Sequence, residues 1–375
     1  MLEEELYTLK IKKKENSYKN YLDNKFDILL TNQIINQDII KDNLTKDILD
    51  YQKFVINHRE NYEETNEKII DKIQDKINCI NRNYKAKLYG SRATNLCLMW
   101  SDIDIVICNE KRNSIKIKEE IKKDSEVDFE EEEINYDFLE RLNKLLNSDI
   151  TFVESIKYLN KAKVPIIKIK TTKEYNSVMI DITLQTKDHF GLKCVNLVKK
   201  LMKEYDTLEI LLFPLKTMLK ISGLNDPYNG GLSSYALILM IVYFLEYQKK
   251  MKKEINKEKI GNLFYDFLFF YGGRLDTNHI DINNINNINN KINKNPFIYI
   301  ADPLNNQNNV AKTSFNYIEI KFIFLIALQI LNEPCFCHCH FNIDDTCKNK
   351  EEHNFLNKIF FGIKRGKLNY FSLNK

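Results

Sequence analysis

The sequence lacks an apolar run that could cross a bilayer. Its longest apolar run, Ala236 to Leu245, is far shorter than the roughly 20 residues that a membrane-spanning helix requires. The first residues, Met1 to Lys10, are acidic and polar, unlike a secretory signal peptide. These absences predict a chain with neither a membrane partner nor a secretory leader.

Glycine and proline are also scarce, and neither sign of charge is in large excess. Only 10 glycines and 6 prolines occur among 375 residues, and the formal net charge is +4. The asparagine-rich stretches are interspersed rather than joined in one tract, so we interpret this composition as coding bias. The small positive charge permits an RNA partner but does not require one.

The cysteines and the length set further limits. The eight cysteines include Cys97, Cys108 and Cys194, which are isolated in apolar segments, and this favours a reducing compartment. A chain of 375 residues, 43% hydrophobic and 29% charged, is expected to fold into two globular domains with sizeable cores.

The most informative stretch is residues 90–107, GSRATNLCLMWSDIDIVI. Asp102 and Asp104 lie at the start of an apolar strand pattern, and alternate residues of a strand share one face. Two adjacent carboxylates repel each other unless a cation neutralises them, and Mg²⁺ binds one or two carboxylates together with substrate phosphates. Gly90 and Ser91 offer a close backbone approach, N–H donors and a hydroxyl to a phosphate. The stretch therefore predicts a metal–nucleotide site.

A third carboxylate, Asp181, interrupts the apolar strand pattern of residues 178–184. An aspartate inside such a strand must be paired or metal-bound. The sequence leaves two readings open: an ion pair with a core lysine, or a third metal ligand.

A second polar group lies in residues 206–246. Lys216 and Lys220 are four residues apart and share one face of an otherwise apolar helix, where a solvated face is the default and an anion between them the alternative. Ser234 and Tyr235 follow a Gly-Gly turn at the start of the next helix. The ordinary roles there are an N-cap and a core aromatic.

At these residues the chain resembles the DNA polymerase beta-like nucleotidyltransferases. It is most similar to the branch of exosome-associated (TRAMP-type) poly(A) polymerases, which lies close to the terminal uridylyltransferases. The resemblance implies that Asp102, Asp104 and Asp181 are catalytic and bind Mg²⁺, with Mn²⁺ possible. It is carried by the Gly-Ser pair, the SDID string and the intervening residues Ala93, Thr94, Leu96, Leu98 and Ser101.

The resemblance also implies the nucleotide contacts. Residues 297–309, FIYIADPLNNQNN, resemble the nucleotide recognition loop. At the position of Asn308, uridylyl-transferring relatives often carry histidine and exosome-type adenylyl-transferring ones asparagine, which favours ATP. Cys194 departs from the family, since relatives commonly have an asparagine near the ribose there. The implied nucleotide-binding residues are Gly90, Ser91, Lys216, Lys220, Ser234, Tyr235 and Asn308.

The implied fold is an α/β nucleotidyltransferase palm with a mixed sheet, followed by a mostly α-helical central domain. We expect a flexible arm at residues 1–36, helices of the central domain at 37–77, the catalytic domain at 78–190 and the rest of the central domain at 191–375. The nucleotide is expected in the cleft between the two domains. A Cys/His-rich insertion at 335–353 has poor spacing for zinc, so an exposed loop is the default.

The expected function is template-independent addition of AMP from ATP to RNA 3′ ends, in RNA surveillance, decay or processing in the nucleus. The alternatives are a terminal uridylyltransferase using UTP, a catalytically weak scaffold that depends on a partner, and a small-molecule nucleotidyltransferase, for which the residues around Tyr235 and Asn308 have no use. No RNA-recognition motif, KH motif or zinc knuckle occurs, so we expect a separate RNA-binding protein partner. No DNA substrate is expected.

Overall fold

The computed structural model describes residues 37–110, 129–162, 164–186, 189–273, 279–284, 298–332 and 354–372. The chain forms two compact units. One comprises Phe54–Lys200, and the other comprises the residues up to Lys53 and from Leu201 onward. Two helices, α2 (Gln37–Glu60) and α7 (Gly191–Glu204), contain the points at which the chain passes from one unit to the other. Among the described residues, no helix is both long enough and apolar enough to cross a membrane.

The unit of residues 54–200, the palm unit, is built on a mixed five-stranded sheet with the order β1-β2-β5-β4-β3. β2 and β5 are parallel, and the other neighbouring pairs are antiparallel. Its elements are α3 (Glu63–Ile80), β1 (Tyr84–Tyr89), α4 (Gly90–Ala93), β2 (Ile103–Asn109), α6 (Phe129–Asn147), β3 (Val153–Leu159), β4 (Ile166–Thr171) and β5 (Met179–Leu184).

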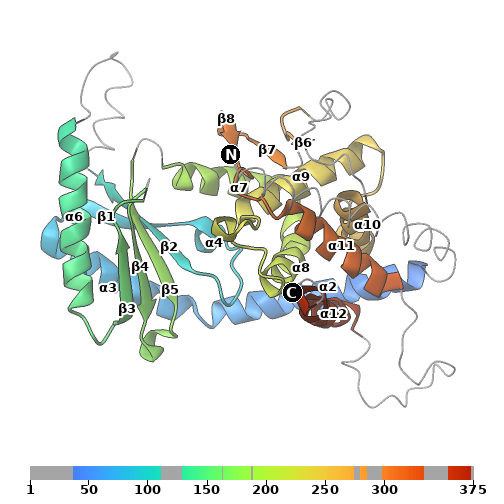
Figure 1. The fold of residues 1–375 in the computed structure, drawn as a ribbon, viewed down its shortest axis with the longest axis horizontal. Helices are drawn as coiled ribbons and strands as arrows, with labels where there is room; N and C mark the ends of the chain where they lie inside the picture. The colour runs from blue at the N-terminus through green and yellow to red at the C-terminus, as the bar shows by residue number, and fades with distance from the viewer. Residues whose placement is uncertain are drawn as a thin grey trace. The chain divides into compact units, whose positions relative to one another are not determined.

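Helices α3 and α6 cover one face of this sheet (Figure 1). The sequence determines which face the helices cover. Alternate residues of β2 and β5 are isoleucine or leucine, and these are fully or almost fully buried. Their partners are the apolar stripes of α3 (Ile69, Ile73, Ile77) and α6 (Phe138, Leu139, Leu142, Leu146). The intervening residues of the central strands, Asp104 and Asp181 among them, therefore belong to the opposite face.

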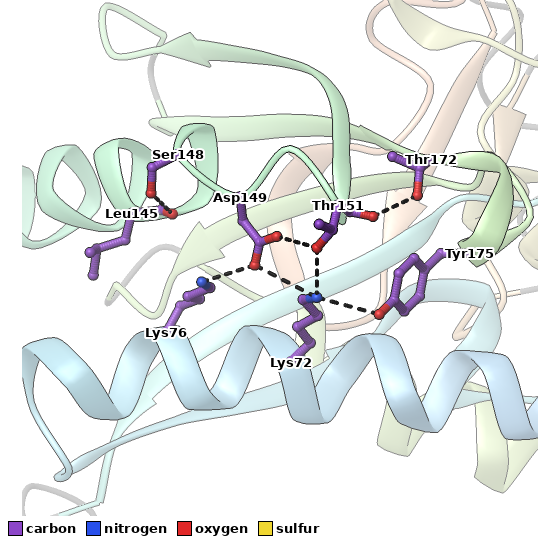
Figure 2. A network of polar contacts seen from close by, with 8 residues as sticks. All are labelled: Lys72, Lys76, Leu145, Ser148, Asp149, Thr151, Thr172 and Tyr175. Atoms are coloured by element: carbon purple, nitrogen blue, oxygen red, sulfur yellow. Dashed lines mark hydrogen bonds and ion pairs between the residues drawn. The ribbon is translucent and has the colours of Figure 1, made fainter.

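A polar network centred on Asp149 fixes the turn between α6 and β3 to helix α3 (Figure 2). The Asp149 carboxylate lies 2.9 Å from Lys76 Nζ and 3.7 Å from Lys72 Nζ, and it accepts a 2.7 Å hydrogen bond from the Thr151 hydroxyl. The Asp149 carbonyl oxygen accepts from the backbone N–H groups of Phe152 and Val153. This one residue thus closes the turn and joins it to the helix beneath.

The other unit, the helical unit, contains α8 (Leu208–Ile221), α9 (Ser234–Lys250), α10 (Ile260–Gly273), α11 (Tyr317–Asn332) and α12 (Phe355–Ser372). A small sheet of β6 (His279–Ile280), β7 (Tyr299–Asp302) and β8 (Asn305–Asn309) accompanies these helices. Helices α10 and α11 pack closely, and their core is rich in buried aromatic rings: Phe244, Phe264, Phe267, Tyr271 and Phe324.

Two contacts tie α2 to the rest of the helical unit. The Asp47 carboxylate of α2 accepts a 2.6 Å hydrogen bond from the Phe355 N–H at the start of α12. Gly261 of α10 lies so close to α2 that a Cβ atom there would be 2.1 Å from the Lys41 carbonyl oxygen. This position therefore requires glycine, and the Gly261 N–H donates to the Thr45 hydroxyl at 2.9 Å.

The expected fold class is confirmed, but the expected boundary at residues 77/78 is wrong. Helix α3 belongs to the palm unit, because its Ile69, Ile73 and Ile77 are buried in the core of that unit. The division at 53/54 therefore falls within α2, and the later division falls at 200/201 rather than 190/191. Strand β3 was absent from the expected elements.

Candidate active site

The sheet of the palm unit brings together two of the expected catalytic carboxylates. Asp104 of β2 pairs directly with Asp181 of the parallel strand β5. On the outer sides, Tyr89 of β1 pairs with Asp104, and Lys168 of β4 pairs with Asp181. Directly opposed residues on neighbouring strands share one face. The face of the sheet opposite to α3 and α6 therefore carries the row Tyr89, Asp104, Asp181, Lys168.

Gly90 follows β1 immediately and presses its backbone against this row. Its φ of +66° is a conformation that favours glycine. A Cβ atom at this position would lie 2.1 Å from Asp104 Oδ2, so no side chain fits there. Ser91 is the second residue of the short helix α4 that Gly90 opens.

The loop that carries Asp102 is held by local hydrogen bonds. Arg92 Nη2 donates to the Ser101 carbonyl at 2.6 Å, and the Ser101 hydroxyl accepts from the Leu98 N–H at 2.9 Å. Asp102 is exposed and directly precedes β2, which begins at Ile103. The strand that the sequence predicted here thus begins at Ile103, and Asp102 lies in the loop directly before it.

Of the two roles that the sequence left open for Asp181, the structure shows the ion pair, and the role as a metal ligand stays a prediction. Lys168 Nζ lies 2.5 Å from Asp181 Oδ2, so the ion pair with a lysine is present. The second carboxylate oxygen, Oδ1, is buried and has no hydrogen-bond partner among the residues that the structure describes. A buried oxygen of this kind is costly unless a further partner binds it.

The carboxylates of the row fit a divalent cation. Carboxylate oxygens are the ligands that Mg²⁺ prefers, and the orphaned Asp181 Oδ1 lies on the strand next to Asp104. Within the described ranges, no three His, Cys, Asp or Glu side chains converge on one point. A cation held here would therefore take a small number of protein oxygens, as Mg²⁺ does when substrate phosphates complete its coordination.

The surroundings of the row keep Tyr89 neutral. Burial raises the pKa of Tyr89 to about 12, and the negative charges of Asp104 and Asp181 add to the effect, while a hydrogen bond with Thr183 opposes it. His189 packs edge-on against the Tyr89 ring, and burial lowers the pKa of its imidazole. At neutral pH, therefore, the carboxylates have an uncharged phenol on one side and the Lys168 ammonium on the other.

The helical unit carries a separate group of expected nucleotide contacts. On α8, Lys216 is half-buried and Lys220 is exposed, whereas nearly all other residues of the helix are buried. At the start of α9, the Ser233 hydroxyl accepts from the Ala236 N–H at 3.1 Å and so provides the N-cap. Ser234 is therefore the first helical residue and not the cap.

Tyr235 and Asn308 meet at a residue to which the sequence assigned no role. Asp302, at the end of β7, is 6% exposed and accepts the Tyr235 hydroxyl at 3.1 Å and the Asn308 amide nitrogen at 2.8 Å. The signal was present in the sequence, since Asp302 ends the apolar run that precedes the loop. A buried carboxylate at the end of a strand needs hydrogen-bond donors. The sequence does not show which residues supply them, because the fold brings them together.

The expected site residues are divided between the two units. The palm unit contains Gly90, Ser91 and the three aspartates, and the helical unit contains the lysines, Ser234, Tyr235 and Asn308. The expected position of the nucleotide between the domains stays a prediction. Cys194 is half-buried. The Cys/His-rich insertion lies outside the described residues.

Comparison with known proteins places this site in a family context. Residues 44–200 match the family model described as "Poly(A) RNA polymerase, mitochondrial-like, central palm domain". The chain is 26% identical to Poly(A) RNA polymerase protein 2 of Saccharomyces cerevisiae over 85% of its length and 52% of that relative. It is 25% identical to the "inactive non-canonical poly(A) RNA polymerase protein Trf4-2" of Drosophila melanogaster, over 67% of this chain and 59% of that relative. The chain thus spans about half the length of these curated relatives.

Two solved structures share the fold. The polymerase core of TRAMP, an RNA surveillance complex, superposes with a TM-score of 0.61 at 22% identity, over 86% of this chain and 94% of that chain. A cytoplasmic RNA terminal U-transferase gives a TM-score of 0.53 at 19% identity, over 76% of this chain and 95% of that chain. The polymerase core of an RNA surveillance complex and a terminal U-transferase therefore both occur among the structural neighbours.

Proposed function

We propose that this chain is a poly(A) RNA polymerase-like nucleotidyltransferase that adds AMP from ATP to RNA 3′ ends without a template, because residues 44–200 match the palm-domain model and the chain is 26% identical to a poly(A) RNA polymerase. The observation that carries the proposal is the pairing of Asp104 with Asp181 beside the backbone of Gly90. A relative named inactive matches almost as well, so likeness alone does not establish catalysis. The intact carboxylates argue for an enzyme over the partner-dependent scaffold.

In the proposed mechanism, the three aspartates hold the reacting groups through Mg²⁺, with Mn²⁺ as a substitute. When bound, the metal ions lower the pKa of the RNA 3′-hydroxyl and neutralise the charge that develops on the phosphates. Asp181 orients the attacking hydroxyl, and Asp102 and Asp104 orient the α-phosphate for in-line attack. Lys168, paired with Asp181, keeps the row from carrying uncompensated negative charge before the substrates arrive.

The remaining residues bind ATP. Gly90 and Ser91 contribute backbone N–H groups and a hydroxyl to the phosphates. Lys216, Lys220 and Ser234 steady the pyrophosphate as it leaves. Tyr235 stacks on the base and Asn308 contacts the base edge, which favours adenine. A terminal uridylyltransferase using UTP is the main alternative, because the same machinery accepts either nucleotide.

The setting of the reaction is part of the proposal. The similarity to the core of an RNA surveillance complex supports a role in RNA surveillance, decay or processing, in the nucleus and with an RNA-binding protein partner. The net charge of +4 leaves room for such a partner to supply the RNA affinity.

Primer extension tests the proposal. The protein is incubated with a short labelled RNA, Mg²⁺ and each of the four nucleoside triphosphates separately. We expect extension with ATP, and a loss of at least about 1,000-fold in Asp102→Ala, because metal-held charge stabilisation is removed. The control is Asp75→Ala, which removes an exposed carboxylate of α3 and should leave the rate unchanged.

The outcomes separate the candidate functions. Extension with UTP in preference to ATP would keep the mechanism and replace the base assignment. Extension by Asp102→Ala at the wild-type rate would remove the catalytic assignment altogether. A wild-type protein that is inert with all four nucleotides, and with Mn²⁺, would favour the scaffold if it stays inert when supplied with cellular RNA-binding partners.

A further inference from the structure

We propose that the indole ring of Trp100 stacks on a base at the 3′ end of the RNA substrate. The inference rests on the proposed function for the kind of ligand, and it adds a binding site for an RNA base to the palm unit. Because it concerns the acceptor RNA, it holds whether ATP or UTP is the incoming nucleotide.

Trp100 lies in a tight turn shortly before strand β2. The Ser101 N–H donates to the Leu98 carbonyl oxygen at 2.9 Å, and the Leu98 N–H donates to the Ser101 hydroxyl at 2.9 Å. These two bonds close a β-turn with Met99 and Trp100 at its central positions. Turns favour Gly, Pro, Asn, Asp and Ser, so the geometry of this turn does not explain a methionine and a tryptophan there.

The two central residues of the turn are large and apolar, yet exposed. Trp100 is 39% exposed and Met99 is 44% exposed, whereas residues 96–98 directly before them are at most 4% exposed. Single apolar residues scattered over a surface are ordinary, but an aromatic ring and a methionine next to each other beside a candidate active site indicate a binding surface. They offer apolar contact area that the described residues leave uncovered.

The backbone that carries this ring is fixed from both sides. Arg92 Nη2 donates to the Ser101 carbonyl oxygen at 2.6 Å, and Arg92 Nε donates to the Asp102 carbonyl oxygen at 3.4 Å. Before the turn, the Arg59 guanidinium donates to the Asn95 carbonyl oxygen. A ring held on a fixed backbone loses little entropy when a ligand stacks on it, so the turn is suited to act as a stacking platform.

The position of the ring indicates which part of the substrates it contacts. Trp100 precedes Asp102 by two residues, so their Cα atoms are at most about 7 Å apart. In the proposed mechanism the RNA 3′-hydroxyl is bound at the aspartates, which brings the last bases of the RNA within reach of the indole ring. The base of the incoming nucleotide is assigned to Tyr235 of the helical unit, so the ring on the palm unit is left for the RNA.

The charge beside the turn favours an anionic ligand. Both side-chain hydrogen bonds of Arg92 go to backbone carbonyl oxygens, and in the described part of the chain no carboxylate pairs with its guanidinium. Arginine binds phosphate well, and every stacked base brings a phosphate with it. An aromatic ring for the base and a cation for the backbone are the parts of a site for single-stranded nucleic acid that accepts any base.

The test uses the fact that Trp100 is the single tryptophan of the chain. The full chain in Mg²⁺, without nucleoside triphosphate, is titrated with a short single-stranded RNA while tryptophan emission is recorded. Matched RNAs lack one base, at the last nucleotide, at the nucleotide before it, or at the 5′ end. Primer extension then gives kcat/KM for each RNA.

Three variants accompany the wild type in both measurements. Trp100→Ala removes the ring, and Trp100→Phe keeps a smaller aromatic face. The control, Ile150→Ala, removes an apolar side chain that is 82% exposed in the turn between α6 and β3, elsewhere in the palm unit.

We expect the intact RNA to quench the emission, and the loss of a base near the 3′ end, but not at the 5′ end, to weaken the quenching. Trp100→Ala should lower kcat/KM for the intact RNA about tenfold, within the range of one stacked base, and leave the KM of the incoming nucleotide unchanged. Trp100→Phe should recover most of this loss, and Ile150→Ala should match the wild type. On the RNA that lacks the stacked base, Trp100→Ala and the wild type should be equal.

Three results would overturn the inference. If Trp100→Ala uses the intact RNA as well as the wild type does, the ring takes no part in RNA binding, and a protein partner becomes the better candidate for this turn. If the losses from Trp100→Ala and from each missing base multiply, the ring and the 3′ bases do not interact. If Trp100→Ala raises the KM of the incoming nucleotide instead, the ring contacts that nucleotide.

Failure of the proposed function is a separate outcome. A protein that is inert with all four nucleoside triphosphates would contradict the proposed function, but the quenching by RNA is measured without catalysis. Emission that responds to the bases at the 3′ end would then still support the contact, and emission that does not respond to them would overturn it.

Discussion

Asp181 lies between a carboxylate and a cation on the two neighbouring strands. Asp181 is on β5. It pairs in register with Asp104 on the parallel strand β2 and with Lys168 on the antiparallel strand β4. The Lys168 ammonium neutralises one charge of this pair of carboxylates, with Asp181 only 15% exposed and Lys168 40% exposed. A divalent cation bound at these carboxylates would therefore act on the same negative charge as the Lys168 ammonium.

At the scale of this residue, we predict that Lys168→Met destabilises the protein in EDTA by about 1–3 kcal/mol, because Asp181 loses its partner. Mg²⁺ should recover more stability in this variant than in the wild type, since the ammonium no longer competes with the metal. Urea unfolding with EDTA and with Mg²⁺ measures both effects.

Lys170→Met is the matched control. Lys170 lies on the same strand and pairs with Glu154 at 2.7 Å, but both partners are about 40% exposed. An exposed ion pair contributes about 0–1 kcal/mol, and Lys170 pairs in register with Met179 rather than with an aspartate. The stability that Mg²⁺ adds should therefore be the same in Lys170→Met as in the wild type. Equal behaviour of the two variants would contradict the role assigned to Lys168.

The turn between α6 and β3 shows how an element is held at its end. Burial tends to raise the pKa of Asp149, but hydrogen bonds from Lys76 and Thr151 and the charges of Lys72 and Lys76 outweigh it and lower the pKa to about 2 (Figure 2). A carboxylate with a lowered pKa in the folded state stabilises the fold above its unfolded pKa, near 4, and loses that contribution as the pH falls toward 2.

At the scale of this element, we predict that Asp149→Asn lowers the free energy of unfolding by about 1 kcal/mol at pH 7. The difference from the wild type should shrink between pH 4 and pH 2, where the wild-type carboxylate takes up its proton. Urea unfolding across this pH range measures it. Asp137→Asn, which removes an exposed carboxylate of α6 paired with Arg141, is the control, and a pH-independent deficit in Asp149→Asn would refute the electrostatic explanation.

For the whole molecule, the balance of charge bears on how RNA is bound. The chain carries 56 lysines and arginines against 52 aspartates and glutamates, so no large surplus of positive charge is available to phosphates. Affinity for nucleic acid that comes from phosphate contacts scales with the number of cations engaged and falls with salt. The two units therefore have little charge with which to hold RNA unaided.

We predict that the isolated protein binds a short single-stranded RNA weakly, with a Kd of about 1 μM or higher at 150 mM salt. A gel shift or fluorescence anisotropy titration at 50 mM and 150 mM salt measures this. Tight binding that resists salt would remove the need for a partner that supplies RNA affinity.

The sequence by itself determined the two central strands of the palm and the carboxylates that they carry. The alternation of isoleucine with polar residues in β2 and β5 predicted the strands, because a strand with one buried face has a period of two residues. The resemblance at the Gly-Ser pair and SDID string indicated the family and the three aspartates before any pairing was known. Strand β3 was not predicted because its seven residues alternate weakly between apolar and polar, and Val153 alone among them is buried.

Only the tertiary structure decided which side chains meet. Strand register brought Asp104, Asp181 and Lys168 into one row, and packing assigned α3 to the palm through the burial of Ile69, Ile73 and Ile77. Local patterns state which face of an element is apolar, but they do not specify what packs against it. For the same reason, Asp302 read as the end of a strand until the fold placed Tyr235 and Asn308 within hydrogen-bonding distance of its carboxylate.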